Sequence, residues 1–549
     1  MMKKTQPWAP FIIIILTMLL NSCKHKEKAD LILINGLVYT VDSAFSISQA
    51  FAVSDGVFLA TGTNEDILDR FESGLIIDAN GKPVLPGLID GHCHFFHNAI
   101  TNFRGVNLRG TDSFGDILDL LKNFHEAHSE EWITGRGWDQ NDWKIKEFPE
   151  NSELDRLFPG IPVVLTRIDG HAVLASSAAL NIAGISVETK IPGGKIVLKN
   201  GIPTGILLDN AADRVKELIP KPDRDAKIHA LLQAQKECFA YGITSLVDAG
   251  LYYDEVMMID TLQQEGKLDL RINAMLSPDS ENITKFVKRG PVYKERLAVS
   301  SVKLYADGAL GSRGALLLEP YSDDPGNYGI RISDPDYLRV LLATAYESGY
   351  QVCTHCIGDS ANRMMLHLYG EVLGGPNDRR WRIEHAQVVH PDDFQVFGKY
   401  NIIPSVQATH CTSDMYWAGE RLGNERVKGA YAYKKLLDQN GWLVNGTDFP
   451  IESLNPMLTF YASVARKDLK GFPEGGFQVE NALSRTDAMR SMTIWAAQGS
   501  FEEEAKGSIE AGKYADFVIL DKDPMTVPEK EIPGIRVLKT YLNGELVFE

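Results

Sequence analysis

The stretch Leu88-Ile-Asp-Gly-His-Cys-His94 is a β-rich run that ends in two histidines separated by one residue. Side chains at positions i and i+2 of a strand point to the same side, so His92 and His94 can both reach one metal ion. Neutral imidazole is the commonest protein ligand for zinc-like metals. Taken alone the pair decides little, because two such histidines can equally be ordinary hydrogen-bonded residues.

This stretch is the first of eight strand-like runs that alternate with helical patterns. The runs are Leu88–His92, Thr244–Asp248, Arg271–Leu276, Ser301–Tyr305, Gln351–His355, Trp381–His385, Ile402–Gln407 and Leu443–Asp448. Such alternation indicates βαβ units, and eight of them predict an α/β fold, a (β/α)₈ TIM barrel over residues 87–504. The gap between the first and second runs is too long for one crossover. It predicts an insertion at about residues 105–230.

Polar side chains follow several of these runs at the point where each one ends. His355, His385 and Asp448 each end a run, and Lys303 lies within the fourth. In a (β/α)₈ barrel the active site is built at the C-terminal ends of the strands. A carboxylate such as Asp448 can bind a metal ion and also accept a proton from water. The set therefore predicts a metal-dependent active site.

Lys303 has two possible roles. A lysine that points into a barrel mouth is costly as an unpaired cation. One role is a salt bridge to a carboxylate such as Asp307. In the other, its amine reacts with carbon dioxide to give a carbamate whose two oxygens bridge two metal ions.

Several motifs together resemble the binuclear amidohydrolase superfamily, and amidohydrolase family 3 in particular, which includes N-substituted formamide deformylase. The matching segments are 87–94, 135–139, 169–171, 302–312, 355–359, 382–387, 406–410, 446–450 and 507–516. The resemblance covers nearly all of the chain after residue 30. It implies a hydrolase that cleaves a non-peptide carbon–nitrogen bond in an amide, formamide or cyclic amide.

The resemblance also implies one or two divalent metal ions, with zinc the expected metal. The implied ligands are His92 and His94 for the first ion, His355 and His385 for the second, Lys303 as a bridging carbamate, and Asp448 on the first ion and as the base. The same site could cleave an ester or deaminate a ring. A lipoprotein that binds a ligand without turnover is a further alternative, but it would need neither a bridging lysine nor a base.

Five further residues are candidates for contact with the substrate. We expect His171 and His410 to hydrogen-bond the carbonyl or the tetrahedral intermediate, and Trp138 to form an apolar wall. Asp307 and Arg313 lie in a glycine-rich loop after the fourth strand, where the backbone can approach a ligand. The alternatives are that His171 caps a turn and that Trp138 belongs to the core.

Both ends of the folded region consist of short β-rich runs separated by Asn-Gly and similar turns. Neither end has enough strands to bury a sheet face alone. We therefore expect residues 31–86 and 505–549 to pair into one composite β-sandwich domain.

The N-terminus is typical of an exported bacterial lipoprotein. Two lysines precede the apolar run Phe11–Leu20, which is shorter than the ~20 residues of a membrane-spanning helix. Leu20-Asn21-Ser22-Cys23 resembles a lipobox. We expect residues 1–22 to be the signal peptide, Cys23 to be lipidated, and residues 23–30 to tether the protein to a membrane on the periplasmic or cell-envelope side.

The composition is that of a globular protein, with 549 residues, 44% hydrophobic and 23% charged. A net charge of −17 without a basic patch argues against nucleic-acid binding. The expected partners are a small amide-type substrate, the membrane through the lipid anchor, and a second copy of the chain in a homodimer.

Overall fold

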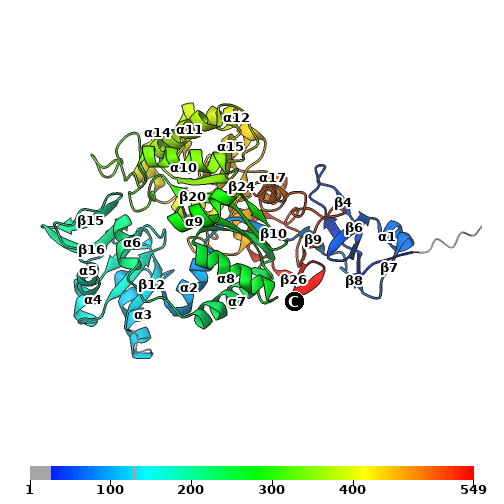
Figure 1. Cartoon of the computed structure of the whole chain (residues 1–549), viewed down its shortest axis with the longest axis horizontal. Helices are drawn as coiled ribbons and strands as arrows, with labels where there is room; N and C mark the ends of the chain where they lie inside the picture. The colour runs from blue at the N-terminus through cyan, green and yellow to red at the C-terminus, as the bar shows by residue number, and fades with distance from the viewer. Residues whose placement is uncertain (1–25, 128–130) are drawn as a thin grey trace, which may run out of the picture.

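The structure is a computed structural model that describes residues 26–127 and 131–549, with backbone only at 102–104. Its centre is a barrel of eight parallel strands that neighbour one another in chain order (Figure 1). The strands are β10 (Leu88–Cys93), β17 (Ile243–Leu251), β18 (Arg271–Leu276), β20 (Leu297–Tyr305), β21 (Gln351–Cys356), β22 (Arg382–His385), β23 (Ile403–Val406) and β24 (Val444–Asn445). All eight predicted strands are present, with ends that shift by a few residues. Figure 1 shows the barrel between two smaller β-rich parts of the molecule.

Glycines bring the first and last strands together and nearly close the barrel. A Cβ atom at Gly91 would lie 2.3 Å from Val444 Cγ1, and one at Gly446 would lie 2.4 Å from His92 N. Beyond β24, Asp448 N donates to His92 O at 2.7 Å. This bond joins the C-terminal ends of the two edge strands and sets His92 beside Asp448.

Helices follow the barrel strands and pack outside them. They include α2 (Phe95–Arg104), α7 (Arg224–Ala240), α8 (Tyr253–Gln264), α9 (Ser280–Lys285), α10 (Pro335–Glu347), α11 (Asp359–Leu373), α12 (Phe394–Tyr400), α15 (Tyr433–Asn440) and α16 (Pro456–Ala465). Every residue of β17, β18 and β21 is buried. These strands are therefore covered on both faces, as is usual for a parallel barrel, and the polar side chains among them are buried.

The predicted insertion contains a six-stranded sheet of its own. Its order is β11 (Val106–Asn107), β12 (Ile133–Trp138), β13 (Val163–Arg167), β14 (Ala172–Ala175), β16 (Ile202–Asp209) and β15 (Gly194–Lys199). The helices α3 (Phe114–Ala127), α4 (Ser152–Leu157), α5 (Ser177–Ile182) and α6 (Asn210–Lys216) belong to the same unit. In Figure 1 it lies at the left, beside the barrel.

Two further sheets are built from the two ends of the described chain. One contains β6 (Val57–Gly62), β5 (Ala50–Ser54), β2 (Leu31–Ile34) and β8 (Ile76–Asp78). The other contains β27 (Glu545–Phe548), β26 (Val537–Leu542), β25 (Phe517–Leu520), β9 (Pro83–Pro86), β3 (Leu37–Tyr39) and β4 (Ile47–Ser48). The Phe51 ring of the first sheet lies 4.9 Å from the Phe517 ring of the second, within one apolar cluster.

The predicted signal peptide and the lipidated Cys23 lie outside the described residues. Within residues 26–127 and 131–549, the structure has no helix with the length and apolar character needed to span a bilayer.

Candidate metal centre and active site

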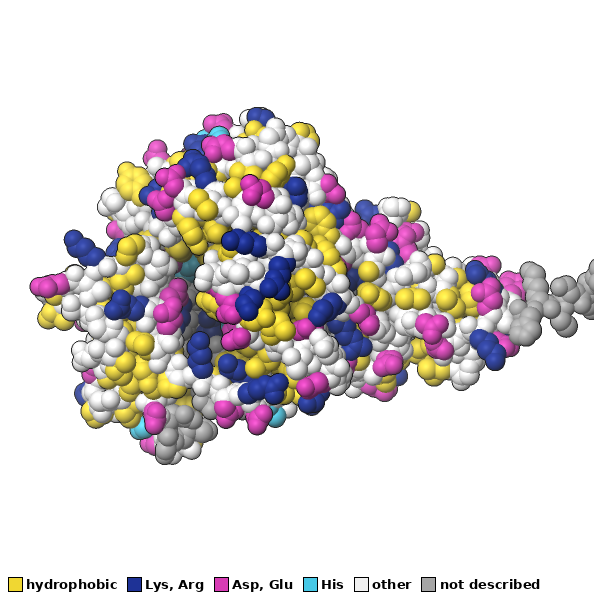
Figure 2. All heavy atoms as spheres, viewed as in Figure 1, with side chains coloured by type: hydrophobic (Ala, Val, Ile, Leu, Met, Phe, Trp, Pro, Cys, Tyr) yellow, Lys and Arg dark blue, Asp and Glu magenta, His cyan; other side chains and the backbone are white. Residues whose placement is uncertain are grey.

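A cavity opens at the C-terminal ends of the barrel strands, between the barrel and the insertion. Its volume is about 880 Å³, counted out to its open mouth. Figure 2 shows a recess between the two units with histidine visible inside it. Residues that line the cavity include His94, Lys303, His355, His385, His410 and Asp448 from the barrel, and Arg167, Asp169 and His171 from the insertion.

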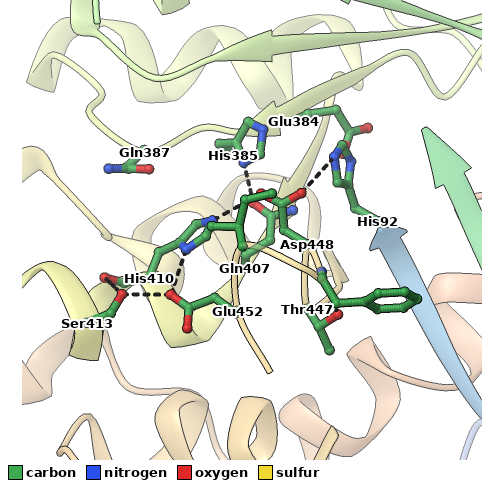
Figure 3. A network of polar contacts seen from close by, with 12 residues as sticks. His92, Glu384, His385, Gln387, Gln407, His410, Ser413, Thr447, Asp448 and Glu452 are labelled. Carbon is green, nitrogen blue, oxygen red and sulfur yellow. Dashed lines mark hydrogen bonds and ion pairs between the residues drawn. The ribbon is translucent and has the colours of Figure 1, made fainter. Parts of the chain in front are cut away.

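Asp448 lies at the centre of the polar groups in this cavity (Figure 3). Its Oδ1 atom is 3.2 Å from His94 Nε2 and 3.6 Å from His92 Nε2. Its Oδ2 atom is 3.4 Å from His410 Nε2. One carboxylate is therefore within contact distance of three imidazole nitrogens.

Three of the histidines are held by a hydrogen bond at Nδ1, which leaves Nε2 directed toward Asp448 or the cavity. The bonds join His92 to Glu384 at 2.6 Å, His94 to the carbonyl of Ala249 at 3.1 Å, and His385 to Oε1 of Gln407 at 2.6 Å. A carbonyl oxygen only accepts, so Nδ1 of His94 carries the proton and Nε2 presents a lone pair. Burial lowers the pKa of His94 to about 4, so this ring is neutral at pH 7. This is the usual way a protein orients metal-binding histidines.

The donor atoms fit a divalent metal site. Two groups have ligand atoms within 4.8 Å of one another, namely His92, His94 and Asp448, and His385, His410 and Asp448. Nitrogen and carboxylate donors of this kind suit zinc. Asp448 Oδ1 and His355 Nε2 are also buried without a hydrogen-bond partner within the described residues. Metal ions bound in this cavity would give both atoms a partner.

The second group differs from the pair predicted for the second metal ion. It contains His410 with His385, whereas the prediction paired His385 with His355. The His355 ring still packs against the His385 ring, with centroids 4.5 Å apart. His355 therefore lines the same site, but its ligand atom lies outside the tight group.

Lys303 is buried at the floor of the cavity, and its Nζ atom lies 3.1 Å from Nε2 of His92. The structure gives Lys303 no carboxylate partner within salt-bridge distance in its described residues. The alternative salt bridge to Asp307 is not formed, because the Asp307 carboxylate instead accepts backbone N–H groups of Leu316, Ile357 and Gly358. Burial lowers the pKa of Lys303, which favours the neutral amine.

The backbone is strained where two of these side chains enter the site. His385 has a φ of 71° and Asp448 has a φ of 57°, although neither is glycine. Such conformations cost about 1–3 kcal/mol each and collect at functional sites. Burial acts to raise the pKa of Asp448, but contacts with His410 and His94 outweigh it and hold the pKa well below its usual range. Asp448 is therefore an ionised carboxylate.

His171 and His410 line the cavity on opposite units, as the sequence predicts. His171 Nδ1 lies 2.7 Å from Oδ1 of Asp209, and the two rings of His171 and His355 are 4.9 Å apart. His410 Nδ1 lies 3.1 Å from Oε1 of Glu452. Burial acts to lower the pKa of His410, but Asp448 and Glu452 outweigh it and raise the pKa to about 10. Each ring thus has a carboxylate behind it.

Three of the five residues predicted to contact the substrate, namely Trp138, Asp307 and Arg313, do not line the cavity. Trp138 is fully buried in the core of the insertion, and its Nε1 donates to the carbonyl of Leu165. Asp307 accepts the three backbone N–H groups described above, and its Oδ1 atom also lies 3.8 Å from Nε2 of His355. Arg313 points to Asp323 at 2.9 Å. A different tryptophan, Trp417, supplies the indole of the cavity wall. These three predictions are wrong because they used position along the chain alone. In the folded protein, the insertion buries Trp138 in its own core, and the loop after β20 directs Asp307 and Arg313 to other partners.

Sequence reasoning missed the residues that hold the imidazole rings. They are Glu384, Gln407, Asp209 and Glu452. Glu384 and Gln407 belong to the Arg-Ile-Glu-His and Val-Gln-Ala-Thr-His motifs. The motifs identify these two residues, but they do not predict which histidine each one contacts. Nothing in the sequence placed Asp209 beside His171, because 37 residues of the insertion separate the two.

Comparisons with known proteins show the family of this chain. The model of the amidohydrolase family matches residues 75–548. The chain is similar to Protein LONG AFTER FAR-RED 3 of Arabidopsis thaliana, with 34% identity over 95% of this chain and 92% of that one. It is also similar to N-substituted formamide deformylase of Arthrobacter pascens, with 25% identity over 95% and 99% of the two chains. An uncharacterized metal-dependent hydrolase of Pyrococcus horikoshii superposes with a TM-score of 0.74 at 29% identity, covering 91% of this chain and 99% of that one. The chain therefore belongs to the amidohydrolase family, in its family 3 branch, and is a hydrolase.

Proposed function

We propose that this protein hydrolyses the carbon–nitrogen bond of a small non-peptide amide or formamide, using divalent metal ions held at the ends of the barrel strands. The observation that carries the proposal is the arrangement around Asp448. Three imidazole Nε2 atoms lie within 3.6 Å of its carboxylate, and the other nitrogen of each of those rings is occupied by a hydrogen-bond acceptor.

Six side chains would hold the ions. They are His92 and His94 for the first, with Asp448; His385 for the second, with His355, whose ring packs against it although its ligand atom lies outside the tight group; and Lys303 between them. Zinc is the metal we propose, because imidazole and carboxylate donors suit it. Lys303 would bridge as a carbamate, formed when its neutral amine adds to the carbon of carbon dioxide and releases one proton. Its burial and its lack of an acidic partner support that reaction.

Bound divalent ions polarise a carbonyl and lower the pKa of water to about 7. The protein's own side chains would transfer the proton and stabilise the developing negative charge. Asp448 accepts the proton of the attacking water at Oδ2 and returns it to the leaving nitrogen. His410, 3.4 Å from that oxygen, and His171 on the opposite wall would hydrogen-bond the carbonyl oxygen as negative charge develops on it.

The cavity favours a small substrate. Its apolar lining includes Leu310, Ile357, Trp417 and Ile451, beside the polar groups already described. A pocket of roughly 300–1,000 Å³ with apolar walls and a few fixed polar groups is typical of small-molecule sites. A relative is an N-substituted formamide deformylase, and we propose that this chain acts on substrates of the same class.

The proposal is tested by assaying the zinc-loaded protein against para-nitroformanilide and para-nitroacetanilide, with para-nitrophenyl acetate and adenine as the ester and deamination controls. We expect release of nitroaniline by the parent and a loss of at least about 100-fold in kcat for Asp448→Asn. Activity that survives this substitution, or turnover of the ester or adenine alone, would reject amide hydrolysis at this centre.

We also propose that the mature protein is a lipoprotein whose two end sheets form one small sandwich domain next to the tether. The lipobox at residues 20–23 and the cluster shared by both sheets support this proposal. In a bacterial host, the parent should partition into the detergent phase of a Triton X-114 extract, and Cys23→Ala should not. Equal partitioning of the two would refute the anchor.

A further inference from the structure

Asp209 lies directly behind His171 and outside the cavity. Its Oδ1 atom is 2.7 Å from Nδ1 of His171, and its side chain is 1% exposed against 17% for His171. Asp209 N also donates to the carbonyl of His171 at 2.7 Å. Two hydrogen bonds therefore join Asp209, at the end of β16, to His171, which precedes β14. One connects the two backbones, and the other connects the two side chains.

The backbone takes an unusual conformation to place this carboxylate. Asp209 has φ 51° and ψ −126°, although it is not glycine. L-residues rarely adopt this region, because the Cβ atom clashes with the backbone. The strain falls at the junction of β16 and α6, where the chain could turn in many other ways. The surrounding structure therefore stabilises this strained conformation, which places the Asp209 carboxylate next to His171.

The barrel leaves room for the same carboxylate. A Cβ atom at Gly308 would lie 2.7 Å from Oδ1 of Asp209, and one at Gly314 would lie 3.1 Å from Oδ2. Both glycines belong to the loop that follows β20, which also carries Asp307. Side chains at either position would push the carboxylate away from His171. Two separate parts of the chain, the insertion and this loop, thus adapt to one contact.

We infer that Asp209 is a positioning residue, which holds the His171 ring so that Nε2 faces the scissile carbonyl. The inference rests on the proposed amide hydrolysis at this site. Asp209 does not line the cavity, so it can act on a substrate only through His171. A carboxylate that holds Nδ1 of a histidine fixes both the ring orientation and the nitrogen that is left to act. On the opposite wall Glu452 likewise contacts Nδ1 of His410, but Glu452 itself lines the cavity.

The test is a double-mutant cycle of Asp209→Asn and His171→Ala in the zinc-loaded full protein, with para-nitroformanilide as substrate. Asparagine suits this position, because it tolerates a positive φ and keeps the shape of the side chain while removing its charge. The matched control is Asp213→Asn on α6, since Asp213 is exposed and pairs with Lys216.

We expect Asp209→Asn to lower kcat on the order of 100-fold with little change in KM, the lower end of what a positioned proton-transfer group contributes. In the His171→Ala background the same substitution should change kcat less than about twofold. Asp213→Asn should match the parent. An equal loss of kcat in both backgrounds, or no loss in the parent background, overturns the inference.

A second readout does not depend on turnover. In protein labelled with ¹⁵N-histidine, the Nδ1 proton of His171 should give a downfield signal that is absent in His171→Ala, moves upfield in Asp209→Asn and is unmoved in Asp213→Asn. A signal that Asp209→Asn leaves in place overturns the inference. If the parent hydrolyses none of the amides, the proposed function fails, while this signal still decides the role of Asp209.

Discussion

Oε2 of Glu384 lies 2.6 Å from Nδ1 of His92, and neither side chain is exposed to solvent. Glu384 also accepts a hydrogen bond from Nη2 of Arg382 at 3.1 Å, and the same Nη2 contacts the carbonyl of Gly91 at 2.7 Å. Arg382, Glu384 and His92 thus form a buried chain of charged and polar groups from β22 to β10. Desolvation acts to raise the pKa of Glu384, but Arg382 and His92 hold it far below its usual range. An ionised Glu384 therefore fixes the ring that faces Lys303 and Asp448.

Replacement of Glu384 with glutamine should weaken metal binding. The amide is a weaker acceptor and leaves Arg382 without a counter-charge, so the His92 ring loses its orientation and basicity. Loss of such a partner typically costs about 10- to 100-fold in metal affinity. Competition with a fluorescent zinc chelator measures it. Glu371→Gln, at an exposed residue paired with Arg339, is the control and should bind zinc like the parent; equal affinity in the two variants would contradict this role.

Zinc binding should withstand mild acid. Burial lowers the pKa of His94 to about 4, and it also holds the pKa of His385 well below its usual range. Protons compete with a metal ion only when they can occupy the ligand, so a ligand with a lowered pKa meets less competition as pH falls. We expect apparent zinc affinity to be nearly level from pH 7.5 to about 5.5 and to drop below that. Ordinary histidines would lose affinity from about pH 6.5; a decline that begins there would refute the prediction.

The junction between the barrel and the end sheets should depend on one buried ion pair. Arg271 of β18 contacts Asp516 through Nε at 2.7 Å and Nη2 at 3.1 Å, and both residues are buried. Asp516→Ala would leave a buried guanidinium without its counter-charge, which costs about 3–5 kcal/mol. The urea midpoint should fall accordingly. Glu529→Gln, at the exposed pair with Lys467, should cost less than about 1 kcal/mol; similar shifts in both variants would contradict the account.

The barrel and its polar strand ends could be predicted because both have short-range signatures. Eight strand-like runs that alternate with helical patterns lie in order along the chain and become neighbours in the same order. The histidines at 92, 94, 355 and 385 all lie within one residue of the C-terminal ends of their strands, so the topology brings them together. Asp448 follows the shortest strand, β24, and reaches the site through its bond to the backbone of His92.

The rest depends on long-range packing that no local pattern encodes. The strands of the insertion were not predicted one by one, because its sheet mixes parallel and antiparallel pairs and lacks the regular alternation of strand and helix seen in the barrel. Tryptophan is a residue type that often lines pockets, yet Trp138 is buried in the apolar core of the insertion. The carboxylates behind His171 and His410 come from residues 38 and 42 positions away. Their pairing is visible only once the chain is folded.

The most direct test of the central claim is the metal content of the purified soluble domain, residues 24–549, by mass spectrometry, for the parent and for Lys303→Ala. The account predicts about two zinc ions per chain in the parent and one or none in the variant, because the bridging carbamate is lost. Lys303→Glu, which restores a bridging carboxylate, should recover part of the second ion. A parent that holds no metal after careful loading would contradict the account, and one ion in both proteins would exclude the bridging role of Lys303.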